Sequence, residues 1–235
     1  MPESVLPEYA RVVVIGGGII GCSVAYHLAE MGCEVVLLER DQLTSGTTWH
    51  AAGLMTTYGS GSETTLGIRK HSMELYKRLE QETGQQTGFN PCGFIELAAD
   101  DDRLEEYRRI TAFNRLHGND IQELSPAEVA ELFPFADVSN IRAGFYAEHD
   151  GRINPVDVTM ALAKGARLKG AKIYQNTPVR GVLTRNGAVT GVRTDQGEIR
   201  SEFVVNCAGM WARQLGEQNG VVIPNQAAEH YYLIT

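Results

Sequence analysis

The chain has 235 residues, of which 43% are hydrophobic and 21% are charged, with a formal net charge of −8. This length is enough for one large domain or for a domain with a smaller second lobe. The acidic balance argues against a nucleic-acid partner, which needs a concentrated basic surface, and no apolar run is long enough for a membrane span. A small-molecule ligand is therefore expected, with neither nucleic acid nor membrane as a partner.

The cysteines and the first residues bear on the cellular compartment. The four cysteines form no CxxC pair, which is typical of a reducing compartment. Residues 1–10 match neither a signal peptide nor an Arg-rich transit peptide. We expect the cytoplasm, or the mitochondrial matrix for a eukaryotic protein whose presequence has been removed.

The first elements in chain order predict a βαβ unit. Residues 11–15 form a β-branched run, residues 19–31 have the pattern of a helix, and residues 34–38 form a second buried strand. A glycine turn joins the first strand to the helix. A unit of this kind places both strands parallel in one sheet, so the predicted fold class is α/β with a Rossmann-type domain.

The middle of the chain does not continue the βαβ pattern. Residues 65–83 read as a helix with Ile68, Leu75, Tyr76 and Leu79 on one apolar stripe. A strand at 94–98, a helix at 102–116 and a capping box beginning at Ser125 follow. This block predicts part of an inserted α+β substrate lobe.

The last third predicts a return to the first domain. A helix of residues 156–169 follows Pro155, and strands at 179–184, 188–194 and 198–201 with short turns predict a β-meander. Residues 203–206 form another apolar strand that runs into a glycine turn. The predicted division is a cofactor-binding domain of residues 1–90 and 150–220 and a substrate lobe of residues 91–149 and 221–235.

The glycine turn has the spacing of a dinucleotide-binding motif. Gly16 permits the tight turn, Gly18 lets a pyrophosphate approach the backbone, and Gly21 lets the helix pack closely on the strand. Glu39, at the end of the second strand, is placed to bind an adenosine ribose. The alternative is a tight turn without a ligand, and the motif alone does not separate FAD from NAD.

A family resemblance begins in the next segment. The run Leu43-Thr44-Ser45-Gly46-Thr47-Thr48-Trp49-His50-Ala51-Ala52-Gly53-Leu54 resembles the flavinylation loop of the sarcosine and dimethylglycine dehydrogenases, which are D-amino-acid-oxidase-like FAD enzymes. Glu39-Arg40, Asp150-Gly151 with Pro155, and residues 204–212 also resemble this family. The resemblance therefore covers essentially the whole chain.

The resemblance implies FAD as the cofactor, attached covalently through His50 to the 8α-methyl carbon of the flavin. A neutral imidazole is a competent nucleophile for that carbon, although a histidine that touches FAD without a bond is the alternative. The further residues that the resemblance places at FAD are Ile19, Ile20, Arg40, Gly46, Thr47, Thr48, Trp49, Ala51, Ala52, Gly53, Leu54, Val179 and Trp211. Of these, Val179 and Trp211 could equally be packing residues.

The end of the chain is expected to form one wall of the substrate pocket. Residues 229–235 alternate like a strand and resemble that wall, and His230 is the candidate group for taking the amine proton. An ordinary strand histidine is the alternative. The other histidines lack metal-ligand spacing, so no metal site is predicted.

The implied activity is oxidative N-demethylation of a small N-methylated amino acid such as sarcosine or dimethylglycine. An electron-acceptor protein or oxygen would reoxidise the flavin. The alternatives are an oxygen-using amine or amino-acid oxidase, and a truncated noncatalytic module that binds FAD or a partner. The family pattern continues beyond Thr235, so we expect the remainder of a longer chain or a second polypeptide to complete the site.

Overall fold

The computed structural model describes residues 5–231, and the chain folds into two compact units. The first unit consists of Met1–Ala51, Leu79–Gln85 and Pro155–Thr235, and the second of Ala52–Arg78 and Gln86–Asn154. Residues 52–78, which the sequence-based division groups with the cofactor-binding domain, thus cluster with the second unit. Helix α2 (Glu63–Thr83) contributes to both units.

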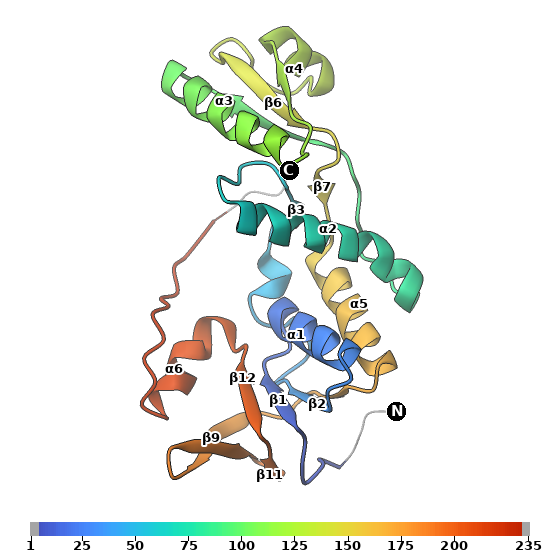
Figure 1. The fold of residues 1–235 in the computed structure, drawn as a ribbon, viewed down its shortest axis with the longest axis vertical. Coiled ribbons are helices and arrows are strands. Elements are labelled where there is room, and N and C mark those ends of the chain that lie inside the picture. Colours follow the sequence, from blue (N-terminus) through green and yellow to red (C-terminus); the bar gives the residue numbers. More distant parts are fainter. Residues whose placement is uncertain (1–4, 232–235) are drawn as a thin grey trace. The chain divides into compact units, whose positions relative to one another are not determined.

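A parallel sheet of four strands organises the first unit (Figure 1). Its order is β12 (Phe203–Asn206), β1 (Val12–Ile15), β2 (Val35–Leu38) and β8 (Lys172–Tyr174), with parallel pairing throughout. All residues of β1 and β2 are buried, as expected for central strands of a covered parallel sheet. The α/β class and the parallel βαβ unit predicted from the sequence are confirmed.

Helices α1 (Ile19–Glu30) and α5 (Pro155–Leu168) lie against each other in the first unit (Figure 1). A Cβ atom at Gly165 would lie 2.7 Å from the ring of Tyr26, so the missing side chain permits this close packing. Tyr26 is fully buried and donates a hydrogen bond from its hydroxyl to Glu82 over 2.6 Å. The contact holds α1 in place, and its N-cap residue Gly18 forms part of the site described below.

The predicted β-meander is also present in the first unit. Strands β9 (Val179–Arg185), β10 (Ala188–Thr194) and β11 (Gly197–Arg200) pair antiparallel in the order β11-β10-β9. Asn186 and Gly187 both have positive φ, as a two-residue hairpin turn requires. Val192 and Ile199 pack in one buried cluster with side chains of β1 and β2, which places the meander on the parallel sheet.

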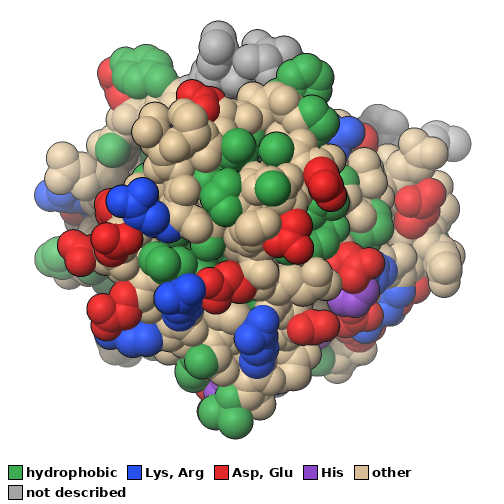
Figure 2. All heavy atoms as spheres, turned by 90° about the horizontal axis from the view of Figure 1, so that it is seen from above, with side chains coloured by type: hydrophobic (Ala, Val, Ile, Leu, Met, Phe, Trp, Pro, Cys, Tyr) green, Lys and Arg blue, Asp and Glu red, His purple; other side chains and the backbone are tan. Residues whose placement is uncertain are grey.

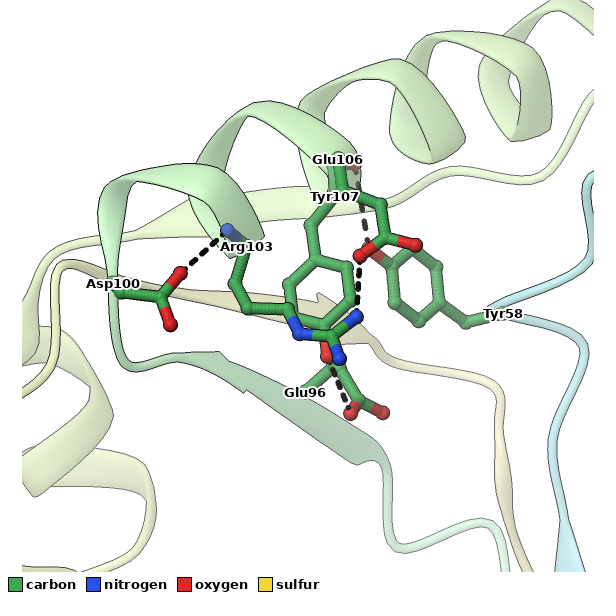
Figure 3. A network of polar contacts seen from close by, with 6 residues as sticks. All are labelled: Tyr58, Glu96, Asp100, Arg103, Glu106 and Tyr107. Carbon is green, nitrogen blue, oxygen red and sulfur yellow. Dashed lines mark hydrogen bonds and ion pairs between the residues drawn. The ribbon is translucent and has the colours of Figure 1, made fainter.

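The second unit contains an antiparallel sheet in the order β4 (Phe94–Ala98), β6 (Ala143–Ala147) and β5 (Gln122–Leu124), and a two-stranded pair of β3 (Leu54–Met55) and β7 (Gly151–Arg152). Its further helices are α3 (Asp101–Leu116) and α4 (Pro126–Leu132). Tyr58 stacks on Phe145 with ring centroids 6.4 Å apart, and Tyr107 meets both rings edge-on. Figure 3 shows Tyr107 reaching from α3 to Glu96 of β4, where its hydroxyl donates a hydrogen bond.

Two details of the sequence-based interpretation are wrong. Ile68 does not belong to the buried stripe of α2, because its side chain is 62% exposed while Leu66 and Met73 are buried. Residues 229–231 form no strand, and the rest of the strand predicted over 229–235 lies outside the described residues.

In the described part of the chain, no helix is long and apolar enough to cross a membrane. Figure 2 shows acidic and basic side chains interspersed with apolar ones over one face of the molecule.

Candidate functional site

The glycine turn between β1 and α1 forms the floor of the candidate site. Gly16 has φ +110°, and a Cβ atom there would lie 2.3 Å from the carbonyl oxygen of Cys207. A Cβ atom at Gly21 would lie 1.9 Å from the carbonyl oxygen of Gly16. Only glycine at these positions lets β12, β1 and α1 converge, so the backbone of the turn is exposed to a ligand.

Helix α1 begins at Ile19, directly after this floor. Gly18 is the N-cap residue and supplies no side-chain cap, while the amide of Ile19 donates to Thr48 Oγ1 over 3.1 Å. A helix N-terminus carries a partial positive charge and unpaired N–H groups, which favour a phosphate. Thr48 thereby ties the predicted flavin loop to the start of α1.

Glu39 lies at the end of β2, beside the glycine turn. Its carboxylate accepts hydrogen bonds from the amide of Gly17 over 2.6 Å and from the amide of Asp41 over 2.9 Å. An ionised carboxylate has about four acceptor positions, so two remain for other donors. The structure therefore holds Glu39 where ribose hydroxyls could bind.

An arginine–tryptophan stack forms another wall of the site. The guanidinium carbon of Arg40 lies 3.8 Å from the centroid of the Trp211 ring, within cation–π distance. Trp211 lies at the end of the short helix Gly209–Trp211, and a Cβ atom at Gly46 would touch its ring at 3.4 Å. Gly46 thus lies beside the indole.

These elements enclose a partly open cavity of about 300 Å³ within the first unit. Its walls combine backbone amides, one carboxylate, two guanidinium groups, an indole and a thiol whose pKa is raised by burial. The raised pKa keeps Cys207 neutral. The lining comprises Ile15, Gly16, Gly17, Gly18, Leu38, Glu39, Arg40, Ser45, Gly46, Thr47, Thr48, Pro178, Val179, Arg180, Cys207, Ala208, Gly209, Trp211, Gln214, Leu215 and Gln218.

About half of the residues predicted to bind the cofactor line this cavity. They are Gly16, Gly18, Glu39, Arg40, Gly46, Thr47, Thr48, Val179 and Trp211. Those outside the lining are Ile19, Ile20, Gly21, Trp49, His50, Ala51, Ala52, Gly53 and Leu54. Gly21 packs against the carbonyl of Gly16 in the turn, and the amide of Ile19 donates a hydrogen bond to Thr48.

His50 ends the short 3₁₀ helix Thr48–His50, whose first residue lines the cavity. The side chain of His50 is exposed, and its ring lies against that of Trp49 with centroids 3.6 Å apart. Beyond it, Leu54 pairs with Arg152, and the amide of Ile153 donates to the carbonyl of Gly53. The loop that the resemblance assigns to the flavin is thus anchored by backbone hydrogen bonds.

His230 lies in an exposed segment without helix or strand and does not line the cavity. Several lining residues were not predicted from the sequence. Gln214 and Gln218 come to the cavity from α6 (Ala212–Glu217) and its C-cap, four residues apart, and that helical spacing is the signal that could have indicated them. Arg180 follows Val179 directly and could have been considered with it.

The sequence singles out Asp150 only as part of the family resemblance, yet this residue is fully buried in the second unit. Its carboxylate accepts hydrogen bonds from the amides of Thr57 and Tyr58 and from the hydroxyl of Thr57. Thr57 lies 93 residues away in sequence, so local spacing carries no signal of this contact. Within residues 5–231 no group of three or more His, Cys, Asp or Glu side chains could hold a metal ion.

Fold and cavity together define a dinucleotide-binding protein. The amide of Gly18 and the N-terminus of α1 suit a pyrophosphate, Glu39 suits a ribose, and Arg40 with Trp211 offers a flat cationic wall. The residues present therefore fit the adenosine diphosphate part of FAD, the cofactor implied by the sequence resemblance.

Comparison with known proteins identifies the family. Residues 11–235 match the family described as DAO, FAD dependent oxidoreductase. The chain belongs to this family of FAD-dependent oxidoreductases, which confirms the resemblance found in the sequence.

Individual relatives resemble the chain along nearly all of its length. It is 43% identical to the mitochondrial pyruvate dehydrogenase phosphatase regulatory subunit of Mus musculus, with 98% of this chain and 26% of the relative covered. Identity is 40% to the mitochondrial sarcosine dehydrogenase of Homo sapiens (100% and 26% covered) and 42% to the mitochondrial dimethylglycine dehydrogenase of Rattus norvegicus (97% and 27%). The crystal structure of L-proline dehydrogenase from P. horikoshii superposes with a TM-score of 0.86 at 31% identity, covering 92% of this chain and 57% of that one. The chain thus spans about a quarter of the length of these three mitochondrial relatives.

Proposed function

We propose that the protein oxidises a small N-methylated amino acid of the sarcosine or dimethylglycine class and releases the methyl group as formaldehyde. The observation that carries the proposal is the identity of 40–42% with both kinds of dehydrogenase over 97–100% of this chain. Because the chain covers about a quarter of these relatives, the proposal concerns the full-length protein.

Different residues of the cavity would bind different parts of FAD. The amide of Gly18 and the start of α1 would hold the phosphates, and Glu39, which accepts a hydrogen bond from the amide of Gly17, would hold the ribose. Arg40 and Trp211 would close one side of the cavity. FAD, when bound, would accept the hydride of the N-methyl carbon at its N5 atom.

We further propose that His50 forms a covalent bond to the 8α carbon of the flavin. Its support is the exposed imidazole at the end of a short helix that starts in the cavity wall. Acid-precipitated wild-type protein should stay yellow, and His50→Ala should release the colour. A colourless wild-type pellet from flavin-loaded protein would reject the bond.

His230 remains a proposed substrate-side base, supported by the family resemblance of its segment. In the full-length protein His230→Ala should shift the acidic limb of kcat/KM against pH, because the amine must lose a proton before it is oxidised. An unchanged profile would remove His230 from the mechanism.

The main test is anaerobic stopped-flow mixing of the flavin-loaded, full-length protein with sarcosine or dimethylglycine. Loss of the oxidised flavin absorbance is the expected result, and no bleaching with any N-methyl amine would contradict the proposal. Assays for peroxide and for reduction of an electron-acceptor protein would then distinguish an oxidase from a dehydrogenase.

The identity of 43% with a phosphatase regulatory subunit favours a second candidate, a noncatalytic module that binds FAD or a partner protein. Retention of flavin without bleaching by any amine would support it. In either case we propose that further chain or a second polypeptide completes the substrate pocket. Because the relatives named above are called mitochondrial, we propose the matrix as the location if the protein is eukaryotic, and the cytoplasm if it is bacterial.

A further inference from the structure

The imidazole of His50 is oriented by a single aromatic neighbour. Its ring centroid lies 3.6 Å from that of Trp49, and the two ring planes are tilted by 34°. Consecutive residues of a 3₁₀ helix project about 120° apart, so their rings do not ordinarily face each other. The contact therefore requires both side chains to turn toward one another.

No other interaction described in the structure fixes this ring. His50 is exposed, and within residues 5–231 neither of its ring nitrogens takes part in a hydrogen bond. Reactive histidines are usually held by a hydrogen bond to one ring nitrogen, which sets the tautomer and the direction of the other. Here the indole takes the place of that hydrogen bond, and both nitrogens stay free.

The backbone below the pair is held firmly. The amide of His50 donates to the carbonyl of Thr47, and Thr48 Oγ1 accepts from the amide of Ile19 at the start of α1. The short helix is thus tied to the turn that would bind the phosphates. Once the backbone is fixed, the ring torsions of His50 are the remaining freedom, and Trp49 restricts them.

From this geometry we propose that Trp49 is a positioning residue for covalent flavin attachment, acting by stacking on His50. The inference rests on the covalent attachment proposed above. In that step one imidazole nitrogen bonds to the flavin 8α carbon, the imidazole loses its N–H proton, and the carbon loses a C–H. Forming this bond releases two electrons, which reduce the flavin and then pass to dioxygen. Dioxygen takes up the two electrons and the two protons and becomes hydrogen peroxide.

The indole also assists the charge change of this step. The attacking imidazole becomes positively charged before it loses its proton, and a cation is stabilised over the face of an indole. Phenylalanine at position 49 would retain a ring for stacking, whereas leucine would retain only apolar bulk. The two substitutions thus separate stacking from packing.

The test follows the rate of attachment after FAD is added to flavin-free, full-length protein. Samples are denatured at intervals, and the fluorescent band is measured on a denaturing gel. Trp49→Leu should slow attachment about threefold to tenfold, the range expected for one aromatic contact, and Trp49→Phe should stay within about twofold of wild type. Equal rates for Trp49→Leu and wild type would overturn the inference.

A second pair of variants shows whether Trp49 acts through His50. In the His50→Ala background no bond forms, so the Kd for FAD can be measured by titration. Trp49→Leu should leave this Kd unchanged, and a Kd raised as much as attachment is slowed would show that Trp49 contacts the cofactor instead. A wild-type protein without a fluorescent band would reject the covalent attachment itself, an outcome distinct from equal rates in a labelled pair.

Discussion

At the scale of single residues, two glycines show how differently the same residue type can be constrained. Gly21 lies where a Cβ atom would come within 1.9 Å of the Gly16 carbonyl oxygen, a backbone atom that cannot move away as the end of a flexible side chain could. Gly67 lies in α2, where a Cβ atom would meet nothing within 4 Å. The first glycine is required by packing, and the second is only a weak point of a helix.

Gly21→Ala should therefore lower the free energy of unfolding by about 2–3 kcal/mol and abolish FAD binding, because the glycine turn must move. Gly67→Ala is the matched control and should raise stability by about 0.5–1 kcal/mol, since alanine is the better helix former. Denaturant unfolding and FAD titration measure both effects. Normal FAD affinity in Gly21→Ala would contradict the packing argument.

Asp150 is a second residue whose environment determines the expected effect. Its buried carboxylate faces three donors, and asparagine would turn an N–H group toward at least one of them. We expect Asp150→Asn to lower the free energy of unfolding by about 2 kcal/mol. Glu105→Gln, on the exposed face of α3, serves as the control and should behave like wild type; equal stability of all three proteins would argue against the network.

At the scale of elements, helix α4 depends on a capping box. Glu128 accepts hydrogen bonds from the amide and the hydroxyl of Ser125, both over 2.7 Å, while Ser125 Oγ accepts from the amide of Glu128. These bonds favour the ionised carboxylate, so the pKa of Glu128 lies below its usual value near 4.5.

A lowered pKa in the folded state means that the carboxylate stabilises α4 above pH 4.5 and loses this effect as the pH falls through the folded-state pKa. Ser125→Ala should cost about 1 kcal/mol at pH 7. Its difference from wild type should shrink on acidification toward pH 3. Unfolding curves at several pH values provide the measurement, and a difference that grows in acid would show the opposite sign.

The elements differ in how far the sequence could predict them. The βαβ unit was predicted because buried runs and the glycine turn are local signals, and β1, α1 and β2 lie as expected. Strands β7 and β8 are short and gain their partners only through distant pairing, Arg152 with Leu54 and Ile173 with Leu37. The helical phase of α2 was misjudged at Ile68 because several apolar positions allow more than one stripe.

The candidate site, too, could be predicted from the sequence only where the signals are local. Residues adjacent to motifs, such as Gly16, Glu39 and Arg40, were predicted, since the motif itself specifies the turn. Arg180 reaches the cavity from the β-meander and Gln214 reaches it from α6, and the positions of both elements depend on the tertiary fold. Asp150 required the pairing of segments 93 residues apart.

At the scale of the molecule, every residue that lines the cavity belongs to the first unit. ADP shares its adenosine and phosphates with FAD, so ADP alone should bind there. Hydrogen exchange should slow on addition of ADP at residues 16–18 and 40–48, while β10, which does not line the cavity, should serve as the unchanged reference. Unchanged exchange in the turn at saturating ADP would contradict the assignment of the cavity.

The placement of the two tryptophans has a spectroscopic consequence. The chain contains only Trp49 and Trp211, one stacked on an imidazole and the other under a guanidinium in the cavity wall. Their emission is thus confined to the first unit, and each indole has a different neighbour. Removing Trp49 leaves Trp211 as the sole emitter, so resonance energy transfer from it to an added flavin would give an optical distance from the cavity wall to the isoalloxazine.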